Sequence, residues 1–324
     1  MTSAQPAGAN GPLSGVPFVH RVVPASRRDA LKQEIETAQA AGLLSGLIFR
    51  NYTRIFDCPL PDDCVGARSL IVGALPHPQS RVTFTWHGTR FTVLVPPSYI
   101  RYWELTRQAE DTLNERLAPL GHWARFARVP QKALAVHSAL GLYGRNNIVY
   151  VPGLGSFHML VSYYSSLPCE EDRWLEPRLL ERCERCTACR RACPTGAIPE
   201  ERTALRQERC ITFYSGYSGP QDLPEWLDSD WIECLIGCRR CQIVCPENRP
   251  FRRWVEDDWE FSERETSLLL NGLTGATLPD AIRVRLDAMG LIEFFGLEEC
   301  LQMLSRKLAI LTSRLQRGAP GRST

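Results

Sequence analysis

The residues of this chain that are best suited to chemistry are eight cysteines in two blocks. The first block reads Cys183-Glu-Arg-Cys186-Thr-Ala-Cys189-Arg-Arg-Ala-Cys193-Pro194, and the second comprises Cys210 and, after a gap, Cys238-Arg-Arg-Cys241-Gln-Ile-Val-Cys245-Pro246. In bacterial two-cluster ferredoxins the spacing Cys-x2-Cys-x2-Cys-x3-Cys-Pro binds 4Fe–4S clusters, and the fourth cysteine ligates the other cluster. The blocks therefore predict two neighbouring 4Fe–4S clusters and the transfer of electrons.

The spacing also predicts which thiolates share a cluster. Three closely spaced cysteines converge on one cluster, whereas the fourth points toward its neighbour. The proline after it prevents a regular helix from continuing. We therefore expect one cluster on Cys183, Cys186, Cys189 and Cys245, and the other on Cys193, Cys210, Cys238 and Cys241. Cys234 is an alternative to Cys210, and the spacing leaves that choice open.

Two other kinds of site use similar cysteine patterns. Structural zinc sites contain Cys-x2-Cys pairs, but two Cys-x3-Cys-Pro endings favour the two-cluster arrangement. The run Cys234-x3-Cys238-x2-Cys241 has radical-SAM spacing, yet it continues to Cys245-Pro246 and has Arg240 where that motif usually carries an aromatic residue. The remaining cysteines are expected to be free thiols: Cys58, Cys64, Cys169 and Cys300.

The composition allows a sizeable hydrophobic core, and the nearly balanced charge produces no strong electrostatic field around the whole protein. The chain has 324 residues, is 44% hydrophobic and has a formal net charge of +2, which does not indicate general affinity for nucleic acid or anionic membranes. All but three of the 38 basic residues are arginines, so a local phosphate- or carboxylate-binding groove stays open. Neither a signal peptide nor an apolar stretch of about 18 residues is recognisable. We expect a cytoplasmic protein without a membrane segment and with reduced cysteines.

Hydrophobic periodicity predicts mixed helices and strands. Before the cysteine blocks, helices are expected at 28–41, 100–117 and 130–141, strands at 69–75, 147–151 and 157–163, and a hairpin at 82–86 and 90–95. After them, three helices are expected: one capped by Ser262 and Glu265, one opened by Pro279, and one with a leucine stripe from Leu297 to Leu315.

These elements predict an α+β protein in four parts. The parts are a flexible tail at 1–18, an α/β domain at 19–172, a ferredoxin-like domain with two 4Fe–4S clusters at 173–259, and a helical region at 260–324.

Several runs resemble the epoxyqueuosine reductase family and, more distantly, the reductive dehalogenases. The stretch Ala139-Leu-Gly-Leu-Tyr-Gly-Arg-Asn146 is similar to the family's Gly-Leu-Gly-Trp-Ile-Gly-Lys-Asn, and Gly155-Ser-Phe157 follows at a similar distance. The cysteine blocks are similar to the family's ferredoxin part in three runs: Cys193-Pro-Thr-Gly-Ala-Ile198, Arg209-Cys210-Ile211 and Gly237-Cys238 through Cys245-Pro246. A cysteine ahead of the long gap is a family feature, which favours Cys210 over Cys234.

The resemblance implies a nitroreductase-like α/β domain that binds cobalamin base-off, with two clusters that deliver electrons to cobalt. The residues implied to line the corrin are Gly141, Leu142, Tyr143, Gly144, Arg145, Asn146, Asn147, Gly155, Ser156 and Phe157. Glycine permits close approach to a flat ligand; the alternative is that these glycines only make turns. No Asp-x-His-x-x-Gly motif occurs, so a histidine-ligated methyltransferase-type site is not supported.

The expected proton donor departs from the family. Epoxyqueuosine reductases carry an acid in an Arg-Asp-Tyr-His-like segment, whereas the corresponding stretch from Ser98 to Glu104 contains no aspartate. Reductive dehalogenases use a tyrosine instead, which makes Tyr99 and Tyr102 candidates. Arg101 is the cation that could assist a phenol of pKa about 10. The alternative is that both tyrosines pack as aromatic core.

The leading hypothesis is therefore a cobalamin-dependent iron–sulfur reductase. A small flavodoxin- or ferredoxin-type donor would supply electrons for the reduction of an epoxide-like or halide-like electrophile. The substrate is expected to be a small molecule or a modified nucleoside, and binding of transfer RNA stays open. The alternative is an electron-transfer protein that serves a partner enzyme without a corrinoid; a flavin in place of the corrin is a third possibility. The size of the stretch from Leu70 to Ser166 favours a bound cofactor or substrate.

Overall fold

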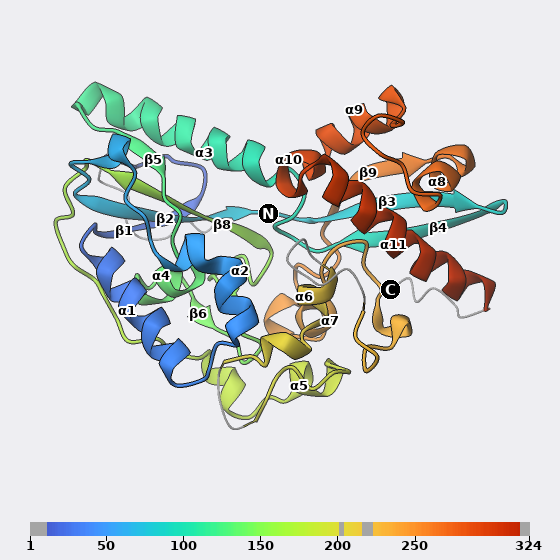
Figure 1. The fold of residues 1–324 in the computed structure, drawn as a ribbon. Helices are drawn as coiled ribbons and strands as arrows, with labels where there is room; N and C mark the ends of the chain where they lie inside the picture. The colour runs from blue at the N-terminus through green and yellow to red at the C-terminus, as the bar shows by residue number, and fades with distance from the viewer. Residues whose placement is uncertain (1–11, 201–203, 216–222, 318–324) are drawn as a thin grey trace.

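The structure, a computed structural model, describes residues 12–200, 204–215 and 223–317. It confirms the predicted α+β class: two lobes, each built on its own sheet, lie side by side above a module that contains the cysteine blocks (Figure 1). Residues 1–11 of the predicted tail lie outside the described residues. Leu13 and Phe18 are buried against the first lobe. None of the described helices is long and apolar enough to cross a membrane.

The first lobe has a four-stranded antiparallel sheet in the order β1-β2-β8-β5. Its strands are β1 (Val19–Pro24), β2 (Ser69–Pro76), β5 (Ala124–Phe126) and β8 (His158–Ser165). Successive side chains of a strand point to opposite faces, so Leu70 and Val72 enter one core whereas Ile71 enters another. Both faces of the sheet are therefore covered.

Helices form the outer layers of the first lobe. They are α1 (Arg27–Ala40), α2 (Gly46–Phe56), α3 (Tyr102–Leu117) and α4 (Gln131–His137). Helix α3 covers one face of the sheet, and α1 and α4 lie on the other (Figure 1). Helix α4 ends before the predicted Gly141 because Ala139 takes a left-handed φ of 58°. A short hairpin follows, made of β6 (Leu142–Tyr143) and β7 (Val149–Tyr150).

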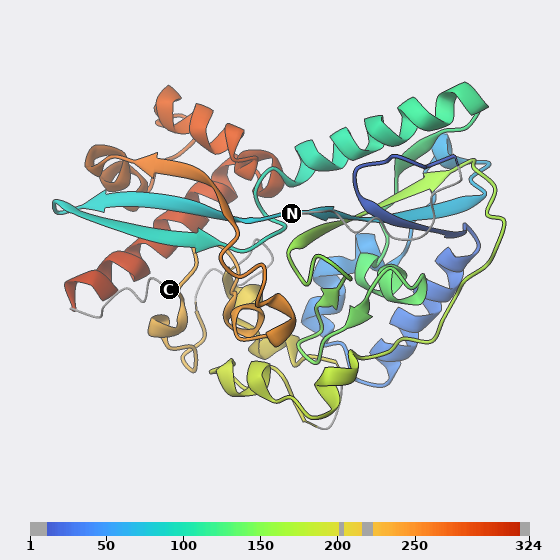
Figure 2. The ribbon, with the colours of Figure 1, turned by 180° about the vertical axis from the view of Figure 1, so that it is seen from behind.

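The second lobe combines segments from the two ends of the chain. Strands β3 (Gln79–Trp86) and β4 (Thr89–Val95) form the predicted hairpin, and β9 (Val255–Phe261) pairs in parallel with β3. Four helices pack on this sheet: α8 (Glu263–Leu270), α9 (Asp280–Ala288), α10 (Leu291–Phe295) and α11 (Leu297–Gln316). Phe84 of β3, Phe261 of β9 and Leu304 of α11 share one core. The C-terminal helices lie beside this sheet when the molecule is seen from behind (Figure 2).

The predicted helix signals after the cysteine blocks are confirmed, whereas β9 was not predicted. Ser262 and Glu265 form the capping box of α8, and Pro279 precedes α9. The predicted domain limit at 259 falls inside β9. The hairpin of β3 and β4, expected in the α/β domain, shares its core with the C-terminal helices instead.

The cysteine module lies below the two lobes in Figure 1 and contains only short helices. These are α5 (Ala188–Ala192), α6 (Ile211–Ser215) and α7 (Arg240–Ile243). Its entry comes from β8 of the first lobe and its exit leads into β9 of the second. The module is thus tied to both sheets.

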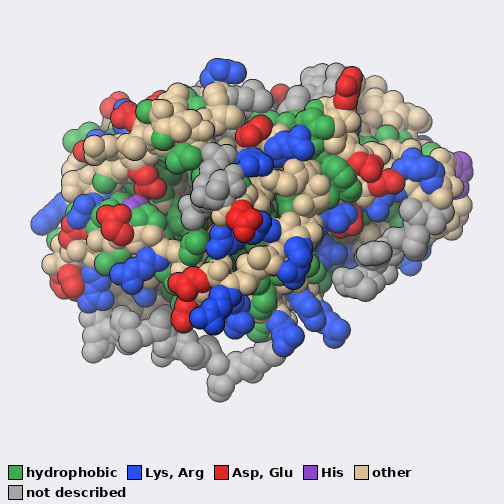
Figure 3. Space-filling view, turned by 90° about the horizontal axis from the view of Figure 1, so that it is seen from below, with side chains coloured by type: hydrophobic (Ala, Val, Ile, Leu, Met, Phe, Trp, Pro, Cys, Tyr) green, Lys and Arg blue, Asp and Glu red, His purple; other side chains and the backbone are tan. Residues whose placement is uncertain are grey.

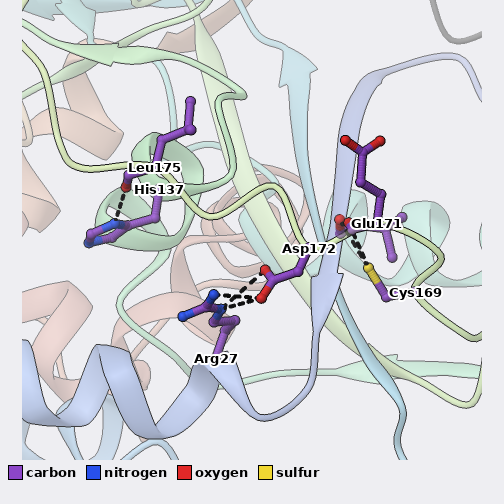
Figure 4. Close-up of polar contacts among 7 residues, drawn as sticks. Arg27, His137, Cys169, Glu171, Asp172 and Leu175 are labelled. Atoms are coloured by element: carbon purple, nitrogen blue, oxygen red, sulfur yellow. Dashed lines mark hydrogen bonds and ion pairs between the residues drawn. The ribbon is translucent and has the colours of Figure 1, made fainter.

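An extended linker, residues 166–180, leads from β8 into the module and is fastened to the first lobe (Figure 4). Arg27 of α1 makes a bidentate ion pair with Asp172. The His137 ring lies between two acceptors, with Nδ1 2.6 Å from the Leu175 carbonyl oxygen and Nε2 2.7 Å from Glu34 Oε2. Burial acts to lower the pKa of His137, but these two hydrogen bonds outweigh it and raise the pKa.

Candidate metal centres and the recess beside them

The first predicted group of thiols surrounds one cavity. The cavity is lined by Cys183, Cys186, Cys189 and Cys245, together with Gly144, Arg145, Asn146, Tyr150, Arg182, Ala188, Pro246 and Glu247. Three of the four cysteines come from the first block, and the fourth, Cys245, comes from the second. The structure therefore brings together the set that the spacing rule predicts. We call this cavity the first site.

The loop after α4 closes one side of the first site. Arg145 donates to the Cys183 carbonyl oxygen through Nη2, at 2.8 Å. The Tyr150 phenol forms a hydrogen bond with the Cys245 thiol, and Asn146 Nδ2 donates to the Tyr150 phenol at 3.0 Å. Such hydrogen bonds orient the ligands and set the charge balance of an iron–sulfur cluster.

The remaining four ligand candidates act on one another's pKa, and we call their position the second site. Desolvation raises the pKa of Cys210, and Cys193 acts on it in the same direction. The pKa of Cys241 is raised to about 12. Desolvation is the largest cause, and the Cys210 thiol is the second largest. The pKa of Cys238 is raised well above its ordinary value, first by desolvation and then by neighbouring thiols that include Cys241. These mutual effects show that the four thiols lie near one another.

Cys210 and Cys234 both lie near Cys238. Cys210 raises the pKa of both Cys238 and Cys241, whereas Cys234 raises that of Cys238, on which its effect is larger than the effect of Cys210. Cys234 is 1% exposed, and Cys210 is half-buried. The assignment of Cys210 as the ligand stays a prediction.

The two sites adjoin each other through α5 and α7. Cys189 lies on α5 and Cys241 on α7, and the Cys189 thiol contributes to the raised pKa of Cys241. Asn146 connects the sites, since its side chain hydrogen-bonds both the Cys241 thiol and the Tyr150 phenol. Within the described residues no three His, Cys, Asp or Glu side chains converge around a single ion position. The four thiols of the first site line a cavity instead.

The glycines of the predicted corrin loop have a packing role in the β6–β7 hairpin. A Cβ at Gly141 would lie 2.6 Å from the Tyr150 carbonyl oxygen, and one at Gly144 would lie 2.5 Å from the Tyr150 ring. Tyr143 pairs through its backbone with residues 178–180, just ahead of Cys183. Leu142 is exposed, and Asn147 has a left-handed φ of 56°.

The second predicted corrin stretch, Gly155 to Phe157, faces the cysteine module. Asn248 Oδ1 accepts from the Ser156 amide at 2.9 Å, and Asn248 Nδ2 donates to Ser156 Oγ at 2.8 Å. Gln242 of α7 also donates to Ser156 Oγ, and Phe157 contacts Phe251. This stretch therefore locks the first lobe onto the second cysteine block.

Lys132 and Tyr99 lie near the second site. Lys132 is exposed and Tyr99 is half-buried. Desolvation lowers the pKa of Lys132 and raises that of Tyr99, and the Cys210 thiol acts on the pKa of both groups. The Tyr99 ring lies against Gly237, next to Cys238.

The other two predicted catalytic residues point elsewhere. Tyr102 is half-buried, is within 3.5 Å of Gln131 Nε2 and packs edge-on against Phe294. Arg101 donates two hydrogen bonds to Glu104 and has a left-handed φ of 56°. Desolvation raises the pKa of both tyrosines, and Arg101 is not among the groups that act on them.

Four residues near these sites were not predicted: Lys132, Tyr150, Asn248 and Lys307. Asn248 carries a weak sequence signal, because it follows Cys245-Pro246 closely. The other three come from segments distant from the cysteine blocks, and their spacing gives no hint of the contact. Only the fold brings them to the thiols.

The outer face of the module carries both signs of charge. Seen from the side of α5, basic and acidic side chains are interspersed (Figure 3). Arg190 pairs with Glu200 at 2.7 Å and Arg182 with Glu247 at 2.6 Å. The Arg182–Glu247 pair lies at the rim of the first site.

Comparison with protein families supports the iron–sulfur interpretation of the module. A family model described as a 4Fe–4S double cluster binding domain matches residues 182–248. This match covers all eight predicted ligand cysteines.

Curated relatives confirm the predicted resemblance. An epoxyqueuosine reductase of Shigella dysenteriae is 30% identical over 180 residues, which is 52% of this chain and 45% of the relative. One from Bacillus subtilis is 28% identical over 235 residues, 68% of this chain and 57% of the relative. The chain thus spans about half the length of the curated relatives it matches.

Solved structures show the same fold. The crystal structure of an epoxyqueuosine reductase with an epoxyqueuosine-modified tRNA stem loop superposes with a TM-score of 0.61 and 20% identity, covering 92% of this chain and 77% of the other. A reductive dehalogenase aligns more distantly, with a TM-score of 0.36 over 74% of this chain. The fold is that of epoxyqueuosine reductases.

Proposed function

We propose that this protein is an iron–sulfur reductase that passes electrons through two 4Fe–4S clusters to a corrinoid and reduces an epoxide-like or halide-like electrophile. One observation carries the proposal: thiols from both cysteine blocks surround the first site. This is expected of two adjoining clusters, because each block then supplies ligands to both clusters. Adjoining clusters suit a relay from a donor to a buried acceptor.

The donor sets fit the groups they would hold. The first cluster would be held by Cys183, Cys186, Cys189 and Cys245, and the second by Cys193, Cys210, Cys238 and Cys241. A corrinoid would bind beside Tyr99 and Lys132, near the second site. When bound, the clusters supply one-electron carriers and the corrinoid supplies a strongly reducing metal centre.

Tyr99 is the proton donor that we favour. Reduction of an epoxide to an alkene consumes two electrons and two protons and releases water. The Tyr99 phenol is protonated at neutral pH and can deliver one of these protons. Desolvation raises its pKa, so a nearby cation would have to stabilise the phenolate that remains. Tyr102, with Gln131 and Phe294 beside it, is the second candidate.

The substrate class is inferred from the relatives. One solved relative holds a tRNA stem loop that carries epoxyqueuosine, and the Bacillus subtilis protein has a catalytic loop with an aspartate. The corresponding stretch of this chain, Ser98 to Glu104, has no aspartate. We therefore expect an electrophile of the same chemical class, protonated by a different acid, and we expect reduction by a flavodoxin- or ferredoxin-type donor.

The first test is cofactor content. The chain is purified without oxygen, supplied with iron, sulfide and hydroxocobalamin, and desalted before metal analysis. About eight irons per chain, with cobalt in equal amount to protein, would support the proposal. Eight irons without cobalt would contradict the corrinoid and leave an electron-transfer protein. Bound zinc without iron would contradict both.

The second test concerns turnover and the acid. The loaded protein, reduced by a flavodoxin, is offered an epoxyqueuosine-modified stem loop, small epoxides and aryl halides. Tyr99→Phe should lower kcat by about 100-fold, which is the lower end of the range for general acid catalysis. Tyr102→Phe should have a smaller effect. Equal losses in both variants, or none in Tyr99→Phe, would exclude Tyr99 as the donor.

A further inference from the structure

Lys307 of α11 is a buried amine without a hydrogen-bond partner among the described residues. Its side chain is fully buried, at 0% exposure, and its Nζ meets no acceptor among the described residues. An unpaired ammonium in a protein interior is costly, so such a group either loses its proton or lies beside an anion. A charged Lys307 would therefore require an anion that the described side chains do not provide.

The face of α11 that carries Lys307 is packed against the segment leading to the second site. Ile310, one turn further along, lies in a cluster with Cys238, and Arg314 Nη1 donates to the Ile232 carbonyl oxygen at 2.5 Å. Residues 307, 310 and 314 share a face because they are spaced three and four apart. This geometry directs Lys307 toward the segment from Ile232 to Cys238.

The ionisable groups around Lys307 leave its charge unbalanced. Desolvation lowers its pKa to about 7, Arg306 acts in the same direction, and only the thiols of Cys234 and Cys238 act in the other. No carboxylate is among these groups. Cys238 is one of the four thiols of the second site, so the missing anion belongs there.

We propose that Lys307 is a positioning residue for the second cluster, whose negative charge it balances and whose reduction potential it raises above that of the first. The inference rests on the proposed function, because it requires a cluster at the second site. A cubane with four thiolate ligands is an anion, and reduction adds one further negative charge. A nearby fixed cation favours the reduced form, and charge and burial are known determinants of cluster potential.

The two sites differ in the charge of the group that lies near their cysteine sulfur atoms. The first site has the neutral Tyr150 phenol on Cys245, whereas the second has the Lys307 ammonium near Cys238. The consequence is a downhill step from the first site, whose rim is exposed, to the second site, which lies near Tyr99 and Lys132. Electrons would then arrive where the substrate is reduced.

The experiment is a redox titration of the anaerobically reconstituted protein, followed by electron paramagnetic resonance. The second-cluster signal is identified as the one lost in Cys238→Ser. Lys307→Met and Lys307→Gln should lower the potential of that cluster by at least about 59 mV, a tenfold change in its one-electron equilibrium constant. Lys307→Arg should stay near the parent. Lys32→Met, an exposed lysine of α1, is the matched control.

The outcomes separate this inference from the proposed function. A parent protein without about eight irons would contradict the proposed function itself. Iron-replete Lys307→Met with both potentials unchanged, or with both lowered equally, would overturn only the role of Lys307. Loss of the second cluster in both neutral variants but not in Lys307→Arg would support the role, because the charge is then required. Loss in Lys307→Arg as well would overturn it.

Discussion

The two cysteine sites share one sequence pattern, yet their surroundings differ. The rim of the first site carries the exposed ion pair of Arg182 and Glu247, and its inner wall is the loop after α4. The second site lies against the buried residues Ile211, Phe213 and Ile232, close to the C-terminal helices. Cysteine spacing sets what binds at each site, whereas the contacts from distant segments set how each site behaves.

This difference suggests that the two sites have different roles in electron transfer within the module. A site near the surface can receive electrons from a partner protein, because the donor can approach it. A site that adjoins Tyr99 and Lys132 can pass electrons to a bound acceptor. Four substitutions test whether the two sites are as distinct as their surroundings imply.

The largest expected effect comes from Cys245→Ser. Although Cys245 belongs to the second block, it lines the first site, so its loss should remove the first cluster and spare the second. Iron analysis should fall from about eight to about four atoms per chain. Cys169→Ser, at a half-exposed thiol outside both sites, should keep the full content. Loss of the same resonance signal in Cys245→Ser and Cys238→Ser would disprove the exchange of ligands between blocks.

Gly141→Ala should destabilise the loop that closes the first site. The added methyl group would lie 2.6 Å from the Tyr150 carbonyl oxygen and 2.7 Å from Val149 Cγ1, and backbone cannot move aside easily. Overpacking of this kind costs about 2 kcal/mol. Chemical denaturation measures the loss. Gly46→Ala, where the nearest atom is 3.4 Å away, should be close to neutral, and equal losses in the two variants would contradict the packing argument.

His137→Gln should weaken the attachment of the linker to the first lobe, and the loss should depend on pH. The raised pKa means that the stabilisation by the charged ring is fully present below the unfolded value of about 6.5 and is lost as pH rises through the folded value. We expect a loss of about 1 kcal/mol at pH 6 and a smaller one at pH 9. Thermal melts at both pH values measure it. A loss independent of pH would mean that the ring acts only by stacking on Trp174.

Tyr150→Phe should give the smallest effect and sharpen the comparison with Lys307. It removes the hydrogen bond to the Cys245 thiol but keeps the ring. The potential of the first cluster should fall by less than the tenfold equilibrium change expected for Lys307→Met, and the second cluster should not respond. The same redox titration measures the resonance signals of both clusters. A shift confined to the second cluster would show that Asn146 transmits the change between sites.

Local signals predicted most of the elements and the four cysteines that line the first site. The hairpin around His87-Gly88, the capping box of Ser262 and the grouping of Cys245 with the first block all follow from short patterns. The end of α4 was not predicted, because Ala139 adopts a left-handed backbone conformation there. Alanine, unlike the glycine that the resembling family has at this position, does not indicate such a conformation.

Contacts between distant segments could not be predicted in this way. Strand β9 is recognisable only through its partner β3, since the run Val255–Phe261 contains four acidic residues and little alternation. Lys307 is likewise one lysine in a leucine-rich helix until Ile310 is seen beside Cys238. Tyr99 and Lys132 likewise come near Cys210 only through the fold.

The parallel pairing of β3 with β9 is expected to form late in folding. The whole module separates these strands in the sequence, so their pairing closes a long loop, and closing that loop has an entropic cost. A module that already holds its clusters is compact and brings the two strands together. Iron supply during synthesis would then decide whether the C-terminal lobe assembles, and in iron-starved cells proteases should cut chains first within residues 255–317.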